Sequence, residues 1–128
     1  MATILIIDDE ETIRVLLCSA LGAAGYEVTE AVNGRKGLDL YRKRPTDLVI
    51  TDIVMPEMNG LDLLLELTRE FLHAKVIAIS GAGDSTHSLS VAKLLGARQT
   101  FQKPFSMPDL LSAVRYENIE LVFRSLPV

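Results

Sequence analysis

The sequence predicts an α/β domain built on a five-stranded parallel sheet with helices on both faces. Two observations predict this fold class: five short apolar runs recur along the chain with helical segments between them, and several of these runs lead directly into charged side chains. Strands that alternate with helices form βαβ units, which build parallel sheets covered on both faces. The chain has 128 residues, of which 48% are hydrophobic, so one domain with an ordinary core is expected.

Five runs of apolar or β-favouring residues are the expected strands. They are Thr3 to Ile7, Tyr26 to Ala31, Leu48 to Thr51, Lys75 to Ile79 and Thr100 to Gln102, and the last of these is the weakest. Largely apolar runs of this kind are typical of parallel strands, because such strands are buried on both faces.

Glycine, asparagine and proline bound the first three helices. Apolar residues at helical spacing from Ile13 to Ala24 predict the first helix, and Gly25 follows its end. Asn33-Gly34 opens the second helix, which must stop before Pro45 because the proline ring excludes its continuation. The third helix follows Asn59-Gly60.

The last two helices are less regular. The fourth is expected from about Ser85 to Leu95 and is poor in helix formers, and the fifth begins after Pro108. From Glu117 the pattern weakens, and residues 119–128 either extend the fifth helix, pair with a neighbour or begin a linker. We therefore expect one domain over residues 1–116 and a C-terminal extension over residues 117–128.

Composition excludes several functions. The net charge of -4 and the absence of a dense basic cluster argue against direct binding of nucleic acid; the longest basic run, Arg42-Lys43-Arg44, is expected to solvate a helix end. No segment has the character of a signal peptide or of a membrane span of about 20 apolar residues, so a cytoplasmic protein without membrane contact is expected. The single cysteine, Cys18, is expected to be a buried thiol.

Charged side chains stand at the carboxyl ends of three expected strands. Asp8 and Asp9 follow the first strand, Asp52 the third and Lys103 the fifth. Parallel strands deliver such residues to one edge of the sheet, so these side chains should meet. Three crowded carboxylates repel one another, and Mg²⁺, which prefers oxygen ligands, would neutralise them. The sequence therefore predicts a magnesium-dependent site that handles phosphoryl groups.

In order and in spacing, these residues resemble the receiver domain of bacterial two-component response regulators, over roughly residues 2–116. The matching motifs are Ile7-Asp8-Asp9-Glu10, Asp52 followed by Met55-Pro56 and Gly60, Ser80-Gly81-Ala82, Gly96-Ala97, and Lys103-Pro104-Phe105. The resemblance implies a doubly wound, flavodoxin-like sheet with the strand order 2-1-3-4-5. The sequence is similar to single-domain receivers of the chemotaxis type.

The resemblance also implies roles for the acids and the lysine. Asp52 would accept a phosphoryl group from a phosphohistidine of a sensor kinase or of a histidine phosphotransfer protein. Asp9, Asp52 and the backbone carbonyl of Val54 match the direct Mg²⁺ ligands, and Asp8 matches a carboxylate that acts through a coordinated water. Lys103 would pair with Asp52 at rest and with a phosphoryl oxygen afterwards, and in the family its bond to the following proline, here Pro104, is cis.

The remaining matches concern the switch. Ser80 matches the hydroxyl residue that bonds another phosphoryl oxygen and draws the following loop, here Gly81 and Ala82, with it. Thr100 stands where many family members have an aromatic residue, and Phe101 should face the other side of its strand. Output through the face of helix four, strand five and helix five is thus expected to differ. That face would bind a downstream protein, a fused output domain or a second copy in a homodimer.

Two other functions fit parts of the pattern. An aspartyl-phosphate hydrolase would want a second acid two residues beyond the nucleophile, where this chain has Val54. A constitutive interaction module without phosphorylation is compatible with Thr100. Neither Val54 nor Ala82 can orient a hydrolytic water. We therefore expect a phosphoacceptor that assists its own phosphorylation and loses the group slowly, and not an enzyme in the metabolic sense.

Overall fold

The computed structural model describes residues 2–81 and 86–125, with the backbone alone for residues 86 and 119–125. The strands are β1 (Thr3–Ile7), β2 (Glu27–Ala31), β3 (Leu48–Asp52), β4 (Val76–Ser80) and β5 (Gln99–Gln102). The helices are α1 (Glu11–Ala23), α2 (Gly34–Lys43), α3 (Gly60–Glu70), α4 (Thr86–Leu94) and α5 (Met107–Ser125). All four strand pairings are parallel, in the order β2-β1-β3-β4-β5. The predicted fold class and strand order are confirmed.

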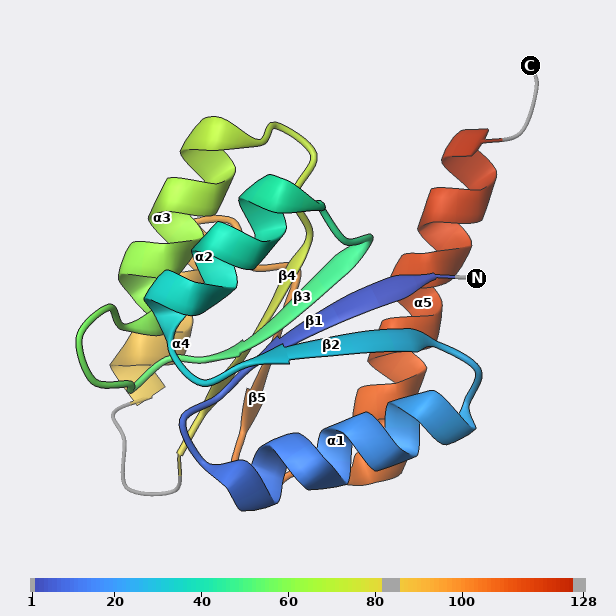
Figure 1. Cartoon of the computed structure of the whole chain (residues 1–128), viewed down its shortest axis with the longest axis horizontal. Coiled ribbons are helices and arrows are strands. Elements are labelled where there is room, and N and C mark those ends of the chain that lie inside the picture. The colour runs from blue at the N-terminus through green and yellow to red at the C-terminus, as the bar shows by residue number, and fades with distance from the viewer. Residues whose placement is uncertain (1, 82–85, 126–128) are drawn as a thin grey trace.

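Helices cover both faces of the sheet. Figure 1 shows α1 and α5 on one face and α2, α3 and α4 on the other. The side chains of β1 alternate between the two layers: Leu5 and Ile7 belong to the core under α2 and α3, whereas Ile4 and Ile6 belong to the core under α1 and α5. This double burial explains why the strand is apolar from Ile4 to Ile7.

Local signals set the starts of α2 and α3 as predicted, whereas α5 begins at Met107, just before Pro108 and not after it. The side chain of Asn33 accepts a hydrogen bond from the backbone N–H of Lys36 at 2.8 Å, and that of Asn59 accepts one from the N–H of Asp62 at 2.9 Å. Each asparagine thereby satisfies a backbone donor that the first helical turn leaves without a partner. Gly25, after α1, has a φ of 98°, which favours glycine.

The fifth helix continues past residue 116. It runs to Ser125, and Glu117 lies within it with its side chain only 2% exposed. The Nζ atom of Lys75 donates a hydrogen bond to the backbone carbonyl of Glu117 at 3.3 Å, and Nε of Arg98 donates to the Glu117 carboxylate at 3.3 Å. These contacts attach α5 to the segments that lead into β4 and β5. Up to Ser125, extension of the helix is the alternative that the structure shows.

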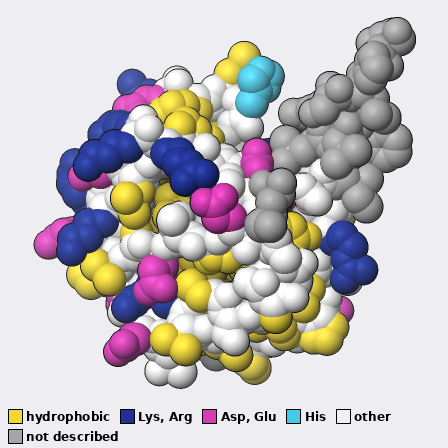
Figure 2. All heavy atoms as spheres, turned by 45° about the vertical axis from the view of Figure 1, so that its right-hand side comes forward, with side chains coloured by type: hydrophobic (Ala, Val, Ile, Leu, Met, Phe, Trp, Pro, Cys, Tyr) yellow, Lys and Arg dark blue, Asp and Glu magenta, His cyan; other side chains and the backbone are white. Residues whose placement is uncertain are grey.

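The basic run Arg42-Lys43-Arg44 lies at the end of α2, as predicted. Two members of the basic run are paired with acids, Arg42 with Glu70 and Arg44 with Glu27. Figure 2 shows basic side chains interspersed with acidic ones on one face of the molecule. The prediction of a buried thiol is wrong for Cys18, which is half-buried. Within the part of the chain that the structure describes, no helix combines the length and apolar character that a membrane span requires.

Candidate functional site

The predicted site residues gather at the carboxyl edge of the sheet. Asp8 directly follows β1, Asp52 and Ser80 are the last residues of β3 and β4, and Lys103 directly follows β5. Because the strands are parallel and adjacent, their ends bring residues that are up to 95 positions apart in sequence into hydrogen-bond contact. Of the four residues that were predicted to meet, Asp8, Asp52 and Lys103 do so.

Lys103 lies at the centre of the group. Its Nζ atom is 3.3 Å from a carboxylate oxygen of Asp8, of Glu10 and of Asp52. The side chains of Asp8 and Asp52 are 2% and 6% exposed, whereas that of Glu10 is 59% exposed. One ammonium therefore serves two buried carboxylates and one at the surface.

The two oxygens of Asp52 have different environments. Oδ2 accepts the hydrogen bond from Lys103, whereas Oδ1 is buried and has no hydrogen-bond partner among the described atoms. Burial, together with the charge of Asp8, raises the pKa of Asp52 to about 6 despite the lysine. A buried oxygen without a partner is the atom at this site that most needs a cation or another electrophile.

The neighbouring charges are shifted by the same crowding. Burial raises the pKa of Asp8, although a hydrogen bond from the backbone N–H of Glu10 and the charge of Lys103 oppose that shift. For Lys103, burial lowers the pKa, but the charges of Asp52 and Asp8 outweigh it, so the pKa lies above its ordinary value. The ammonium is therefore charged at neutral pH.

Three carboxylates are close enough to share a cation. One oxygen each of Asp8, Glu10 and Asp52 lie within 4.8 Å of one another. These oxygen donors and the Asp52 Oδ1 atom without a partner fit the ligand preference of Mg²⁺. Asp9, which the resemblance makes a direct ligand, is exposed and does not belong to this group. Sequence reasoning assigned no role to Glu10, and its only signal was its place as the third acid in succession.

The other predicted residues lie around this group. Val54 follows β3 with its side chain 55% exposed, Gly81 lines an apolar groove beside Lys103, and the Lys103–Pro104 peptide bond is cis. Ser80 is buried, and its carbonyl accepts a hydrogen bond from the N–H of Lys103 at 2.7 Å. Ala82 lies outside the described residues.

The position that lacks the usual aromatic lies in β5. Thr100 is half-buried and stands opposite Ala78 of β4. Phe101 packs into the core under α1 and α5, with its ring centroid 6.3 Å from that of Phe105. Ala78, opposite Thr100, belongs to the core on the other face, so the prediction that Phe101 faces the other side of its strand from Thr100 is confirmed.

Close backbone packing holds the loop that follows Asp52. The N–H of Gly60 donates a hydrogen bond to the carbonyl of Ile53 at 2.7 Å. A Cβ atom at Gly60 would lie 2.3 Å from the backbone oxygen of Asp52, so only glycine fits there. Glu57, within the same loop, has a φ of 67°, a left-handed conformation that is strained for a glutamate.

A largely apolar groove of about 530 Å³ adjoins the lysine. It is lined by Glu10, Ile13 and Leu16 from the α1 side and by Gly81, Lys103, Pro104, Phe105 and Met107 from the other side. Lys103 thus belongs both to the acidic group and to this groove, which gives the site an open, apolar flank.

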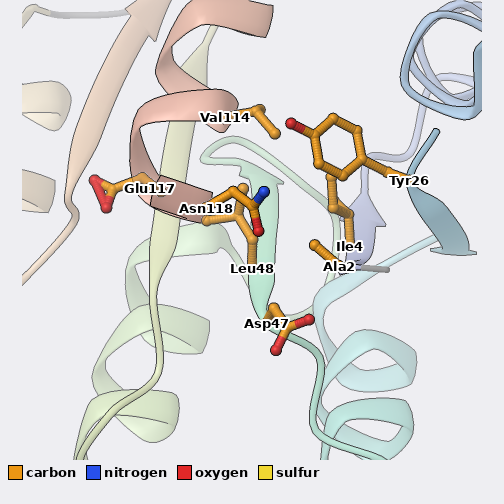
Figure 3. Close-up of a pocket in the computed structure, with 8 residues that line it drawn as sticks. All are labelled: Ala2, Ile4, Tyr26, Asp47, Leu48, Val114, Glu117 and Asn118. Atoms are coloured by element: carbon orange, nitrogen blue, oxygen red, sulfur yellow. The ribbon is translucent and has the colours of Figure 1, made fainter. Parts of the chain in front are cut away.

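A second cavity lies away from these residues. Figure 3 shows Val114 and Asn118 of α5 on one side of it and Tyr26 on the other, with Asp47 below them. Its volume of about 10 Å³ leaves room for about one water molecule. It is therefore too small for a ligand and is part of the packing of α5.

The fold and the site define a class of signalling domain. The family model of the response regulator receiver domain matches residues 4–115. The chain therefore belongs to the response regulator receiver family, as its motifs predict.

Individual relatives agree with this assignment. The chain is 37% identical to the chemotaxis protein CheY of Thermotoga maritima over 87% of its length and 92% of the relative. It is 34% identical to the sporulation initiation phosphotransferase F of Bacillus subtilis, over 88% of this chain and 90% of that protein. The solved structure of response regulator protein TrrA from Thermotoga maritima, in complex with Mg²⁺–BeF, matches with a TM-score of 0.83 and 32% identity, over 91% of this chain and 99% of TrrA.

Proposed function

We propose that this receiver domain accepts a phosphoryl group on Asp52 from a phosphohistidine of a sensor kinase or a histidine phosphotransfer protein. The observation that carries the proposal is the state of Asp52: it is buried, Lys103 holds one oxygen, and the other oxygen has no partner. A carboxylate in this position can attack an electrophile because its charge is only partly neutralised.

In the proposed transfer, an oxygen of Asp52 forms a bond to phosphorus while the bond between phosphorus and the imidazole nitrogen breaks. The electron pair leaves with the imidazole, and the product is an acyl phosphate on Asp52. Lys103 is within reach of the developing negative charge, since its ammonium already contacts the Asp52 carboxylate at 3.3 Å. Positioning and charge neutralisation carry most of such a transfer.

Mg²⁺ is the cofactor that these ligands would hold. Following the family pattern, we propose Asp9, Asp52 and the Val54 carbonyl as direct ligands, with Asp8 acting through water; Asp9 lies outside the group of Asp8, Glu10 and Asp52 and would have to turn toward it when the ion binds. Glu10 is an additional acid near the same place. When bound, the ion would neutralise charge between the carboxylates and the phosphoryl oxygens.

The phosphorylated state is proposed to change a protein-binding face. Ser80 and Lys103 would bond phosphoryl oxygens, and the movement of Ser80 would draw the loop of Gly81 and Ala82 with it. The face of α4, β5 and α5 would then bind a downstream protein, a fused output domain or a second copy. Since Thr100 lacks a ring, this output cannot depend on an aromatic residue at that position.

The open groove beside Lys103 is the proposed docking place of the phosphodonor protein. An incoming phosphohistidine must reach Asp52 from a side that is not covered by the sheet, and the groove with Ile13, Leu16 and Met107 adjoins that approach. Apolar contacts there would orient the donor while leaving the acids free. We further propose a cytoplasmic location. We also propose the role of a phosphoacceptor and not of a metabolic enzyme, because neither the Val54 nor the Ala82 side chain has a group that could orient a hydrolytic water.

The test is the intact mass of the protein after incubation with acetyl phosphate, with Mg²⁺ or with EDTA. We expect a single phosphoryl adduct that forms only with Mg²⁺ and that is absent from Asp52→Ala. As a matched control, Asp62→Ala removes an aspartate from the exposed first turn of α3 and should retain the adduct. An adduct on Asp52→Ala would refute the assignment, and no adduct on the wild type would favour a constitutive binding module.

A further inference from the structure

Arg14 connects the edge strand of the sheet to the acidic loop of the site. From α1, its Nη1 atom donates a hydrogen bond to the backbone carbonyl oxygen of Asp8 at 2.8 Å. Its Nε atom donates to Oε1 of Glu30, on β2, at 3.1 Å. The arginine side chain is only 11% exposed, so its guanidinium is held inside the protein between these two acceptors.

The contact with Asp8 lies where the acidic loop begins. The Asp8 carbonyl belongs to the peptide that leads to Asp9, and the Asp8 carboxylate accepts a hydrogen bond from the N–H of Glu10 at 2.8 Å. A rotation of this carbonyl would therefore turn the backbone of both following acids. The planar guanidinium, with donors at fixed angles, restrains such a rotation better than a flexible single donor.

Glu30 orients the arginine from the other side. Its second oxygen, Oε2, accepts a hydrogen bond from Sγ of Cys18 at 3.3 Å, so both carboxylate oxygens have partners on α1. Burial and the interaction with Glu30 raise the pKa of the Cys18 thiol to about 11, which keeps the thiol protonated and able to donate. Glu30 is thus fixed by two residues of one helix.

We propose that Arg14 is a positioning residue for the site: oriented by Glu30, it holds the Asp8 carbonyl so that the acidic loop presents its carboxylates to Mg²⁺. This inference rests on the proposed function, because it concerns the same site. The arginine contacts the backbone of Asp8 and not the reacting atoms, so its effect is on the arrangement of the ligands.

The charge of Arg14 and its position have opposite effects on metal binding. A nearby cation repels Mg²⁺, so removal of the charge alone would tighten binding. Removal of the restraint would weaken binding, because the loop would have to be ordered when the ion binds. Contacts that orient metal ligands typically change metal affinity about 10- to 100-fold, which exceeds the effect of one screened charge. The direction of the change therefore separates the two effects.

The experiment is calorimetric titration of the whole chain with Mg²⁺, comparing wild type with Arg14→Met. We expect roughly tenfold weaker binding by the variant. Equal or tighter binding would overturn the proposal. In EDTA, amide hydrogen exchange by nuclear magnetic resonance should be several-fold faster at Glu10 of the variant, and unchanged exchange would also overturn it.

A second variant covers the case in which Arg14→Met does not fold. Arg14→Lys keeps the positive charge but lacks the fork of donors. If Arg14 acted only through its charge, this variant would bind Mg²⁺ as tightly as the wild type. The proposal predicts weaker binding by Arg14→Lys, and an affinity equal to that of the wild type would contradict it.

Two further measurements complete the design. Arg44→Met removes the same charge from an arginine that pairs with Glu27 at the other end of β2, and it should change Mg²⁺ affinity by less than about twofold. A loss of affinity equal to that of Arg14→Met would overturn the proposal.

Adding Glu30→Met to Arg14→Met should not weaken Mg²⁺ binding further, whereas an additive loss of affinity would show that Glu30 does not act through Arg14. Failure of the proposed function is seen separately, as a wild type that binds Mg²⁺ without forming the phosphoryl adduct.

Discussion

At the scale of single residues, the ionisation of Asp52 connects the chemistry of the site with the stability of the fold. Its pKa in the folded protein is about 6, above the ordinary value of 3.8, because the side chain is buried near Asp8. The folded state therefore binds a proton that the unfolded state releases between about pH 4 and about pH 6. The stability that this proton confers is present below that window and is lost as the pH rises through it.

Asp52→Asn should remove this pH dependence. The quantity to follow is the free energy of unfolding of the variant minus that of the wild type, both in EDTA. This difference should rise by about 2 kcal/mol between about pH 4 and about pH 7. Urea unfolding followed by circular dichroism at several pH values measures the difference. A difference that stays constant over this range would contradict the raised pKa of Asp52.

The strained backbone of Glu57 permits a second prediction. Its φ of 67° costs an ordinary residue about 1 kcal/mol, a cost that glycine does not incur. Glu57→Gly should therefore raise the free energy of unfolding by about 0.5 kcal/mol after the greater freedom of the unfolded chain is counted, whereas Glu57→Val should lower it by more than about 1 kcal/mol. Equal stability of the two variants in thermal unfolding would contradict this account.

At the scale of elements, the connection between β3 and α3 depends on one glycine. A Cβ atom at Gly60 would meet the backbone of Asp52 at 2.3 Å and that of Ile53 at 2.7 Å, and backbone atoms cannot rotate aside. Gly60→Ala should therefore lower stability by about 2 kcal/mol or more and reduce phosphorylation, because the loop that carries Val54 must shift.

Gly22 provides the matched control for this substitution. It lies in α1 with nothing within 4 Å of its Cβ position, so Gly22→Ala should raise stability by about 0.5 kcal/mol and leave phosphorylation unchanged. Urea unfolding and the yield of the phosphoryl adduct measure both variants. Similar losses in Gly22→Ala and Gly60→Ala would contradict the packing argument.

Most elements could be predicted because their signals are local. The strands β1, β3 and β4 are largely apolar because both of their faces are buried, whereas β2 and β5, at the edges of the sheet, are more polar and more exposed. Asn33 and Asn59 cap the helices that they were predicted to open. The end of α5 could not be predicted, because the burial of Glu117 depends on Lys75 and Arg98, which are distant in sequence. Alternation and spacing contain no information about such contacts.

In the site, too, some contacts could be predicted from the sequence and others could not. The meeting of Asp8, Asp52 and Lys103 follows from strand ends in a parallel sheet, so it could be predicted. The contact of Glu10 with Lys103 and the exposure of Asp9 depend on how the loop turns after β1, which the sequence does not reveal. The contact of Arg14 with the Asp8 carbonyl belongs to this second kind, because no motif marks it.

At the scale of the whole molecule, buried charges lie at both ends of the sheet. The acidic site stands at the carboxyl ends of the strands, and the ion pair of Lys75 and Glu117, with both side chains 2% exposed, stands beyond the amino end of β4. The first group is open to ligands, whereas the second attaches α5 to the sheet. The acidic site and the ion pair that anchors α5 are thus separated by the length of the strands.

Glu117→Met should test this separation. It removes the carboxylate that pairs with the buried ammonium of Lys75 and should lower the free energy of unfolding by about 3 kcal/mol. Adding Lys75→Met should recover most of the loss. Below the unfolding temperature the yield of phosphoryl adduct should remain that of the wild type. A lower adduct yield from the folded variant would show that the two ends of the sheet are coupled.

The central claim is that Asp52 is the residue that becomes phosphorylated. The most direct measurement is reduction of the phosphorylated protein with borohydride, which converts an aspartyl phosphate to homoserine, followed by peptide mass spectrometry. The account predicts homoserine at position 52 in samples incubated with acetyl phosphate and Mg²⁺, and none in samples with EDTA. Homoserine at position 8 or 9 instead, or phosphate retained on a serine, threonine or histidine, would contradict it.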